Sequence, residues 1–252
     1  MDAMNNDPMN ADLVIGVLGG MGPQATVDFL ARLVAMTPVT REQEHLRVRV
    51  DSNPKVPDRN DAIAGVGASP GPVLADMATG LQRAGADFLV MACNTAHAFE
   101  ADIRAAVSVP FVSMIGEACD ACERDFPHAR RIGVLAAQGC LDARLYQQAL
   151  ARRERDALVL APADQQRFMT LLYRIKQGDL APDVHAGMRA LGETLVAAGA
   201  DVIVAACTEV PLVLREGDLT RPVVDATANL AQRCVRYARR REPLPSSSFP
   251  NR

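Results

Sequence analysis

Two cysteines that end similar segments are the residues best placed to do chemistry in this sequence. Residues 84–97 and residues 198–210 both begin Ala-Gly-Ala-Asp, continue as an apolar run and reach a cysteine followed by polar residues. Cys93 and Cys207 lie 114 residues apart, as do Gly85 and Gly199. Each segment is typical of a helix end, a short buried strand and the start of another helix. The pattern predicts two strand-to-helix junctions, each with a thiol at the carboxyl end of the strand.

The duplication favours a catalytic role for these thiols. A single cysteine at the end of an apolar strand is usually a small core residue. Here Cys93 and Cys207 occupy the same register of two related units, and each is expected beside a helix N-terminus. Such a position lowers a thiol pKa and favours the thiolate, which is a base and a nucleophile.

The repeat extends over most of the chain and predicts the fold. Gly16 recurs as Gly133 in a second glycine-containing apolar strand, and Pro110 recurs as Pro222 before a short apolar strand. Each half alternates strand and helix, which is typical of an α/β protein with a mainly parallel sheet and helices on both faces. We expect two pseudo-symmetric, flavodoxin-like domains with the active site in the cleft between them.

The chain order predicts that the first domain is discontinuous. A last helix, from about residue 227 to 240, follows the final strand of the second unit and is expected to pack back on the first. We therefore assign residues 1–115 with 226–252 to the first domain and 116–225 to the second. Residues 1–11 and 242–252 are expected to be loose ends of the chain.

Composition points to a small-molecule partner. The 252 residues carry a net charge of -3, which lacks the basic footprint of proteins that bind nucleic acid or anionic membranes. No export signal and no apolar run of about 20 residues are present, so we expect a cytoplasmic protein that does not span a membrane. The six cysteines are then expected to be free thiols. The spacing of Cys119 and Cys122 suggests a zinc site, but no further ligands have matching spacing, and no metal is predicted.

A glycine-rich loop follows the first strand. Gly19, Gly20, Met21, Gly22 and Pro23 precede an amphipathic helix and can bring backbone amides close to a small carboxylate. The loop also matches a dinucleotide fingerprint, a weak signal when it stands alone. A purely structural turn is the third interpretation.

Two cations and one histidine complete the candidates. Arg59 lies in a long loop rich in proline and glycine that leaves the same sheet edge as Cys93, where a guanidinium can bind a carboxylate at two points. Lys176 lies in the last turn of a helix that ends at Gly178, where a lysine more often complements the helix dipole. His97, one turn after Cys93, is more often a core or supporting residue than a base.

These residues carry a resemblance to a known family. The Gly19-Gly-Met-Gly-Pro loop, Pro57-Asp-Arg, Cys93-Asn-Thr-Ala-His and Cys207-Thr-Glu-Val-Pro resemble, in order and spacing, the aspartate/glutamate racemase family, and most of all its aspartate racemase branch. The similarity covers nearly the whole chain. Glu209 stands where the glutamate racemase branch typically has histidine, which favours the aspartate branch.

The resemblance implies a mechanism and a set of site residues. Members of the family use no cofactor, place two cysteines on opposite faces of the substrate α-carbon, and are in many cases homodimers. Cys93 and Cys207 would be the two bases, and Arg59 and Lys176 would hold carboxylates of the amino-acid substrate. The other residues expected near the substrate are Met21, Asn53, Asn94, Thr95, Thr208 and Glu209.

The chemistry of racemisation fits these assignments and leaves alternatives open. Charge that develops on the substrate carboxylate must meet preorganised donors, for which we expect the amides at Asn94-Thr95 and Thr208-Glu209 with the two threonine hydroxyls. A broad-specificity amino-acid racemase shares these motifs. A decarboxylase or cis-trans isomerase of the same fold would need one thiol, and a nucleotide or small-ligand binding protein would need none.

Overall fold

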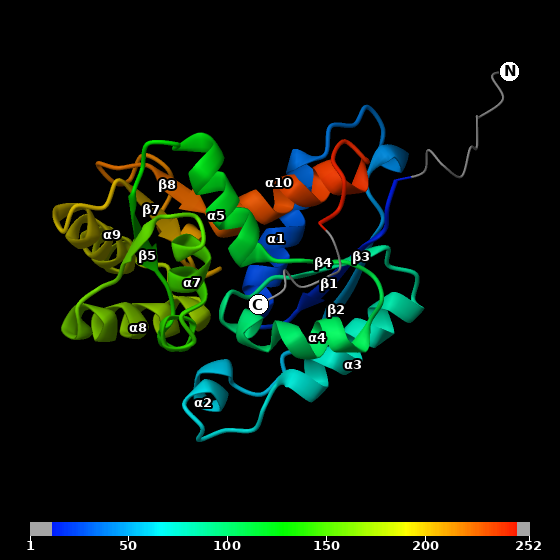
Figure 1. Cartoon of the computed structure of the whole chain (residues 1–252), viewed down its shortest axis with the longest axis horizontal. Coiled ribbons are helices and arrows are strands. Elements are labelled where there is room, and N and C mark those ends of the chain that lie inside the picture. The colour runs from blue at the N-terminus through cyan, green and yellow to red at the C-terminus, as the bar shows by residue number, and fades with distance from the viewer. Residues whose placement is uncertain (1–11, 246–252) are drawn as a thin grey trace, which may run out of the picture.

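The chain folds into two four-stranded sheets with the same topology. The computed structural model describes residues 12–245, in which every strand pairing is parallel. The strand order is β2-β1-β3-β4 in the first sheet and β6-β5-β7-β8 in the second (Figure 1). The predicted α/β class and the internal repeat are confirmed.

The elements alternate along the chain as expected. The first sheet consists of β1 (Ile15–Gly19), β2 (Val48–Ser52), β3 (Phe88–Met91) and β4 (Phe111–Val112). Its helices are α1 (Pro23–Met36), α2 (Arg59–Ile63), α3 (Gly71–Arg83) and α4 (Glu100–Ala106), with 3-10 helices η2 (Glu42–Glu44) and η3 (Thr95–Phe99). The second sheet consists of β5 (Arg131–Leu135), β6 (Asp156–Leu158), β7 (Val202–Ala205) and β8 (Val223–Asp225). The remaining helices are α5 (Met114–Asp125), α6 (Gln138–Asp142), α7 (Leu145–Ala151), α8 (Pro162–Lys176), α9 (Pro182–Ala197), α10 (Ala226–Ala238) and the 3-10 helix η4 (Val210–Leu212).

The recurring glycines have the same structural purpose in both halves. A Cβ on Gly16 would come within 2.5 Å of the Leu89 side chain on the neighbouring strand, and one on Gly133 within 2.4 Å of Ile203. Gly85 and Gly199 follow α3 and α9 with φ values of +88° and +94°, a conformation that glycine adopts without strain. The sequence repeat therefore reflects the same strand packing and the same helix ends in each half.

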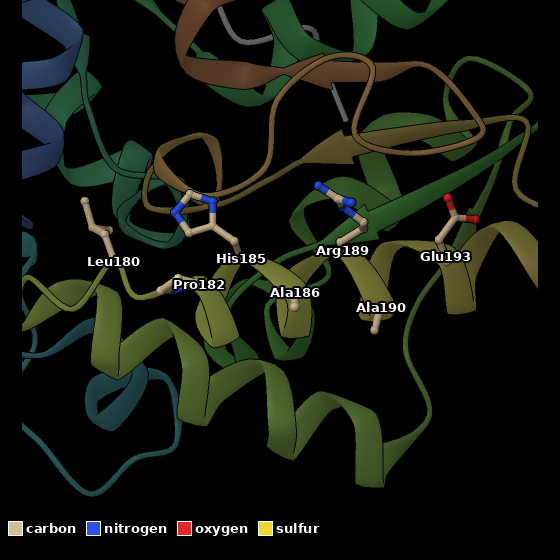
Figure 2. A pocket seen from close by; sticks show the side chains of 7 residues that line it. All are labelled: Leu180, Pro182, His185, Ala186, Arg189, Ala190 and Glu193. Carbon is tan, nitrogen blue, oxygen red and sulfur yellow. The ribbon is translucent and has the colours of Figure 1, made fainter.

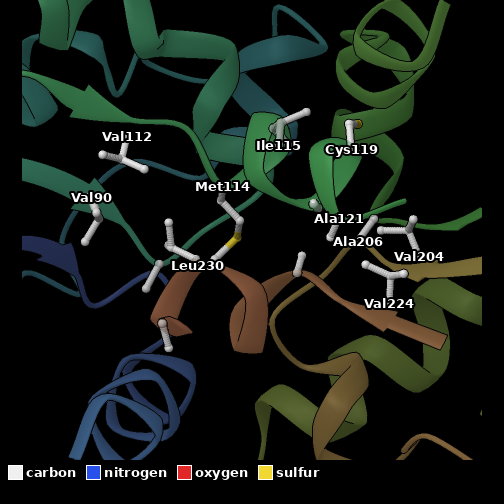
Figure 3. Packing of buried hydrophobic residues seen from close by; sticks show 14 of the residues in the cluster. Val90, Val112, Met114, Ile115, Cys119, Ala121, Val204, Ala206, Val224 and Leu230 are labelled. Carbon is white, nitrogen blue, oxygen red and sulfur yellow. The ribbon is translucent and has the colours of Figure 1, made fainter. Parts of the chain in front are cut away.

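One hydrophobic core is shared by the two sheets. Alternate residues of every central strand point to opposite faces, and the faces that turn toward α5 and α10 form one continuous buried cluster (Figure 3). Met114 of α5 and Leu230 of α10 lie in this cluster together with Val90 of the first sheet and Val204 of the second. The opposite face of each sheet has a core of its own, which contains Cys93 in the first half and Cys207 in the second. The shared layer joins the two halves, and the separate layers carry the thiols.

The last helix, α10, packs against both α1 and α5. Asp225 caps α10 by accepting from the amides of Thr227 and Ala228, and it also pairs with Arg32 of α1 at 2.7 Å. The contact of α10 with α1 supports a first domain that the chain re-enters at residue 226. The domain boundaries stay a prediction, and their outer ends, residues 1–11 and 246–252, lie outside the described part of the chain.

Within residues 12–245, no helix has both the length and the apolar character that crossing a bilayer requires.

Candidate active site

Both cysteines lie just beyond the carboxyl end of the third strand in their sheet. Cys93 comes two residues after β3, and Cys207 comes two residues after β7. Each thiol points to the outer face of its sheet, because it is in step with Leu89 and Met91 in one strand and with Ile203 and Ala205 in the other. The predicted equivalence of the two positions therefore extends to the direction of the side chains.

One small cavity between the two sheets brings the thiols together. Its lining residues come from both halves of the chain: Met21, Arg59, Asn60, Cys93, Asn94, Thr95, Ala137, Lys176, Cys207, Thr208 and Glu209. Of the residues predicted to form the site, only Asn53 is missing from this lining. The cavity measures about 20 Å³, enough for one water molecule but not for an amino acid. The two walls must therefore move apart to admit a substrate.

Glu209 is the central charged group of the second wall. Its Oε2 accepts from the Cys207 thiol at 3.0 Å and from the Thr208 hydroxyl at 3.1 Å, and its Oε1 lies 3.2 Å from Lys176 Nζ. Only 5% of the Glu209 side chain is exposed, whereas 28% of the Lys176 side chain is. Glu209 was expected to contribute its backbone amide, and the structure adds a carboxylate that holds three donors. Burial alone would lower the pKa of Lys176, but the negative charge of Glu209 raises it, so this lysine is cationic.

The expected effect of the helix N-terminus on Cys207 is wrong. Burial raises the pKa of the Cys207 thiol well above its ordinary value, and the nearby Glu209 charge raises it further, whereas Lys176 lowers it. The chain after Cys207 forms only the short 3-10 helix η4 and no α-helix. Because Val210, Val213 and Leu214 are all buried, this stretch lacks the polar face of a surface helix. Cys207 is therefore protonated at neutral pH and is a proton donor in this arrangement.

Cys93 is followed by uncharged polar residues, and the Lys176 charge also acts on its thiol. Helix η3 starts two residues after it, and α4 continues the chain from residue 100. His97 is buried, its Nε2 accepts from the Met114 amide at 3.0 Å, and its Nδ1 lies 2.8 Å from the Cys93 carbonyl. Because Nε2 is an acceptor, Nδ1 carries the proton and donates to that carbonyl. His97 is therefore a supporting residue that holds the Cys93 backbone, as favoured from the sequence.

Two hydrogen bonds across the cavity join the halves, and sequence reasoning missed both. The Tyr146 hydroxyl of α7 donates to Asn94 Oδ1 at 2.7 Å, and the Gly139 amide of α6 donates to Asn60 Oδ1 at 2.9 Å. Gly139 has no space for a side chain, because a Cβ would lie 2.8 Å from that Asn60 oxygen. The partners are 52 and 79 residues apart, so no local pattern indicates them.

Arg59 reaches the cavity from a different element than expected. It is the first residue of the short helix α2, which Asp58 caps by accepting from the amides of Asn60 and Asp61. The Arg59 guanidinium donates to the carbonyls of Val56 and Pro57 at 3.3 and 3.1 Å, and its Nε is buried without a hydrogen-bond partner among residues 12–245. The guanidinium is thus held by its own loop and keeps donors free for a carboxylate.

The glycine loop lies against this site. A Cβ on Gly22 would be 3.6 Å from Glu209 Oε1, so the loop and the Glu209 carboxylate face each other. Gly20, with φ of +87°, packs on the backbone of Asn53, which a Cβ would approach within 2.4 Å. Asn53 supports this loop, and its Oδ1 accepts from the Lys55 amide.

A second, larger hollow lies elsewhere and lacks reactive groups. It runs along the exposed side of α9, measures about 650 Å³, and is lined by Leu180, Pro182, His185, Ala186, Arg189, Ala190 and Glu193 (Figure 2). Its charged residues already have partners, since Arg189 pairs with Asp218 and Glu193 accepts from Thr220. The smaller cavity, which holds both thiols, is therefore the candidate active site.

The other cysteines show no arrangement for metal binding. Cys119 and Cys122 are buried in the shared core, and burial raises the pKa of each thiol to about 12. In the described part of the chain, no group of three or more His, Cys, Asp or Glu side chains is placed to hold a metal ion.

Comparison with known proteins points to one family. The profile of the Asp/Glu/hydantoin racemase family matches residues 18–234. The broad-specificity amino-acid racemase RacX of Bacillus subtilis is 27% identical over 237 residues, which cover 88% of this chain and 96% of RacX. The aspartate racemase of Picrophilus torridus superposes with a TM-score of 0.77 at 26% identity, covering 90% of this chain and 94% of that one. Glutamate racemase RacE1 of Bacillus anthracis has the same fold, with a TM-score of 0.64 at 15% identity over 93% of this chain and 84% of its own.

The predicted resemblance is therefore confirmed at the level of the family. The match covers both cysteine junctions, the glycine loop and the two cations around the cavity. The chain belongs to the Asp/Glu/hydantoin racemase family and is an amino-acid racemase, an isomerase.

Proposed function

We propose that this racemase inverts the α-carbon of an acidic amino acid, aspartate first, with Cys93 and Cys207 as its two acid-base groups and no cofactor. One observation carries the proposal: thiols at equivalent positions of two related sheets line the same cavity. Two functionally unrelated core cysteines are not expected to line the same small polar cavity.

The reaction needs one thiolate and one thiol. A thiolate removes the α-proton from one face, the electron pair is delocalised into the substrate carboxylate, and the opposite thiol returns a proton to the other face. The roles of the thiols are then reversed, and the product is the mirror image of the substrate. The protonated Cys207 suits the donor role, which assigns the first proton abstraction to Cys93 for one enantiomer.

The carbanion must be stabilised by groups already in place. The amides at Asn94-Thr95 and Thr208-Glu209 stand at the start of η3 and η4, where the first amides of a helix lack intrahelical acceptors. These amides can meet the charge that develops on the substrate carboxylate. The hydroxyls of Thr95 and Thr208 belong to the same two segments and line the cavity.

The two cations support an acidic substrate. Arg59 comes from the first half and Lys176 from the second, and both line the cavity with the thiols. An arginine can hold one carboxylate through two parallel hydrogen bonds, while a lysine supplies a compact charge to the other. Aspartate has the two carboxylates that this pair can receive.

A broad-specificity amino-acid racemase is the second candidate, and one observation favours it. The Lys176 ammonium already pairs with Glu209 at 3.2 Å, so only the Arg59 cation is left unbalanced in the cavity lining. One free cation matches one α-carboxylate, whatever the substrate side chain. The similarity to the broad-specificity racemase of Bacillus subtilis is consistent with this alternative.

Incubation with single L-amino acids in deuterated water tests the proposal. We expect deuterium at the α-carbon together with loss of optical purity, fastest for aspartate. Similar rates for many neutral amino acids would favour the broad-specificity candidate. Net loss of a carboxylate or isomerisation of a diacid without racemisation would instead indicate a one-thiol enzyme, and no turnover of any amino acid would contradict the proposal.

Two further expectations stay predictions. The protein is expected to be a homodimer and to be located in the cytoplasm. Sedimentation equilibrium measures the first property, and fractionation of the cells that make the protein measures the second.

A further inference from the structure

Asn94 is an unusual residue in the cavity wall. It directly follows Cys93, only 2% of it is exposed, and its Nδ2 is a buried donor without a hydrogen-bond partner in the described part of the chain. A buried amide donor that lacks a hydrogen-bond partner is destabilising. The residue lines the cavity, so a ligand carboxylate can provide the missing acceptor.

The other end of the same amide is fixed from the opposite half. Tyr146 of α7 is fully buried and its hydroxyl donates to Asn94 Oδ1 at 2.7 Å. Burial raises the pKa of Tyr146 well above its ordinary value, so the phenol keeps its proton and is a donor at every physiological pH. The phenol oxygen can also accept, but its proton needs an acceptor, and Asn94 Oδ1 is the acceptor that the structure shows for it.

This contact decides which way the amide faces. If the amide were rotated by half a turn, the Tyr146 proton would lose its acceptor and the Asn94 oxygen would turn away from it, toward the substrate. An amide oxygen repels a carboxylate, whereas an amide NH₂ donates to it. The Tyr146 hydroxyl therefore favours the one orientation of Asn94 that suits an anionic group.

We propose that Tyr146 is a positioning residue of the second half that orients the Asn94 amide, so that Nδ2 donates to the substrate carboxylate beside Cys93. The inference rests on the proposed racemase mechanism and adds a residue to it. It also links the two walls, because Tyr146 can hold Asn94 only when α7 and η3 are in contact.

Tyr146→Phe removes the hydroxyl and keeps the ring. We expect kcat/KM for the amino acid that the parent racemises fastest to fall by about ten- to a hundredfold, the usual worth of a hydrogen bond to a charged group. Tyr237→Phe is the matched control, since it also removes a buried hydroxyl, one that donates to Glu117 in the shared core. That control should lower the melting temperature and leave kcat/KM unchanged.

A double-mutant cycle separates positioning from general stability. If Tyr146 acts through Asn94, adding Tyr146→Phe to an Asn94→Ala variant should change kcat/KM by less than about twofold. Asn94→Asp keeps an oxygen for Tyr146 but replaces the donor with an anion, and we expect it to be at least about tenfold less active than Asn94→Ala. This variant tests the orientation even if Tyr146→Phe does not fold.

The outcomes distinguish this inference from the proposed function. A parent that exchanges no α-proton would overturn the function itself. An active parent with a folded Tyr146→Phe variant within twofold of its kcat/KM would overturn only the positioning by Tyr146. Full additivity of the two substitutions, or an Asn94→Asp variant as active as Asn94→Ala, would do the same.

Discussion

The two cysteine junctions have similar backbones but differ in the charges of the groups bonded to them. Each thiol comes two residues after the third strand of its sheet and just before a 3-10 helix. The segment of Cys93 makes its side-chain hydrogen bonds through uncharged groups, Asn94 with Tyr146 and His97 with the backbone, whereas the Cys207 thiol donates to the Glu209 carboxylate. The Lys176 charge acts on both thiols. Duplication accounts for the shared geometry, and the burial and side-chain contacts that form on folding account for the difference.

In the proposed mechanism, this difference means that the two thiols begin the reaction in different protonation states. A two-base racemase needs one proton on the pair of thiols, and the Glu209 carboxylate favours its placement on Cys207. In the proposed mechanism the unprotonated partner, the Cys93 thiolate, then removes the α-proton of the enantiomer whose α-proton faces Cys93. The opposite enantiomer requires the proton to move first, so the two directions should differ in their pH dependence.

Removal of either thiol should have the largest effect. Cys93→Ala and Cys207→Ala each delete the proton carrier on one face, and we expect racemisation to slow by a factor on the order of 10³ or more. Optical rotation of aspartate over time measures this loss. Cys119→Ala, which removes a buried thiol of the shared core, is the control and should keep its activity. Near-normal racemisation by either site variant would contradict the two-base mechanism.

The two cations should differ in how they tolerate replacement. Arg59→Lys keeps the charge but loses the planar two-point contact, so KM for aspartate should rise by about tenfold or more. Lys176→Arg places a larger cation beside the buried Glu209, and we expect a smaller rise because the ion pair can persist. Steady-state kinetics with aspartate measure both variants. Equal KM values for Arg59→Ala and the parent would refute the assignment of Arg59.

The sequence predicted the parts of this comparison that are local. The strand, the cysteine and the helix-ending glycine recur as short patterns, and so the two junctions and the repeated α/β fold follow from the order of the residues alone. The electrostatic difference does not, because it depends on side chains that meet only after folding. Lys176 reaches Glu209 from α8, and Tyr146 reaches Asn94 across 52 residues. The pKa of Cys207 was predicted in the wrong direction because burial of the thiol, the largest cause of the rise, and the hydrogen bond to the Glu209 carboxylate both depend on the packing of the folded chain.

Replacing the Glu209 carboxylate should reduce the electrostatic difference between the two junctions. Glu209→Gln keeps the size of the side chain and removes the charge that raises the pKa of Cys207, while Lys176 still lowers it. The pKa of Cys207 should therefore fall. The rate of alkylation as a function of pH is measured on the peptide that contains Cys207, by mass spectrometry in a Cys93→Ala background. This site-specific reading is needed because burial raises the pKa of Cys207 and of each of the four core cysteines. A midpoint that stays unchanged or rises would show that Glu209 does not control the proton on Cys207.

The smallest expected effect is on the pH dependence of stability and concerns His97 at the Cys93 junction, which must stay uncharged. Burial lowers the pKa of His97 below its ordinary value of 6.5, and a protonated ring could no longer accept from the Met114 amide. The unfolded chain therefore binds a proton below about pH 6.5 that the folded chain does not, so the free energy of unfolding falls as the pH falls. The loss approaches about 1.4 kcal/mol per pH unit between the two pKa values of His97, folded and unfolded.

The His97→Gln variant tests this effect, because glutamine can still accept from Met114 and donate to the Cys93 carbonyl. Urea unfolding between pH 7.5 and 5.5, a range of about two units around the histidine pKa, should show that the free energy of unfolding of this variant depends less steeply on pH. His185→Gln on the surface of α9 is the control for loss of an imidazole. If the free energy of unfolding of His97→Gln depends on pH as steeply as that of the parent, the His97 ring does not limit the stability of the Cys93 junction in acid.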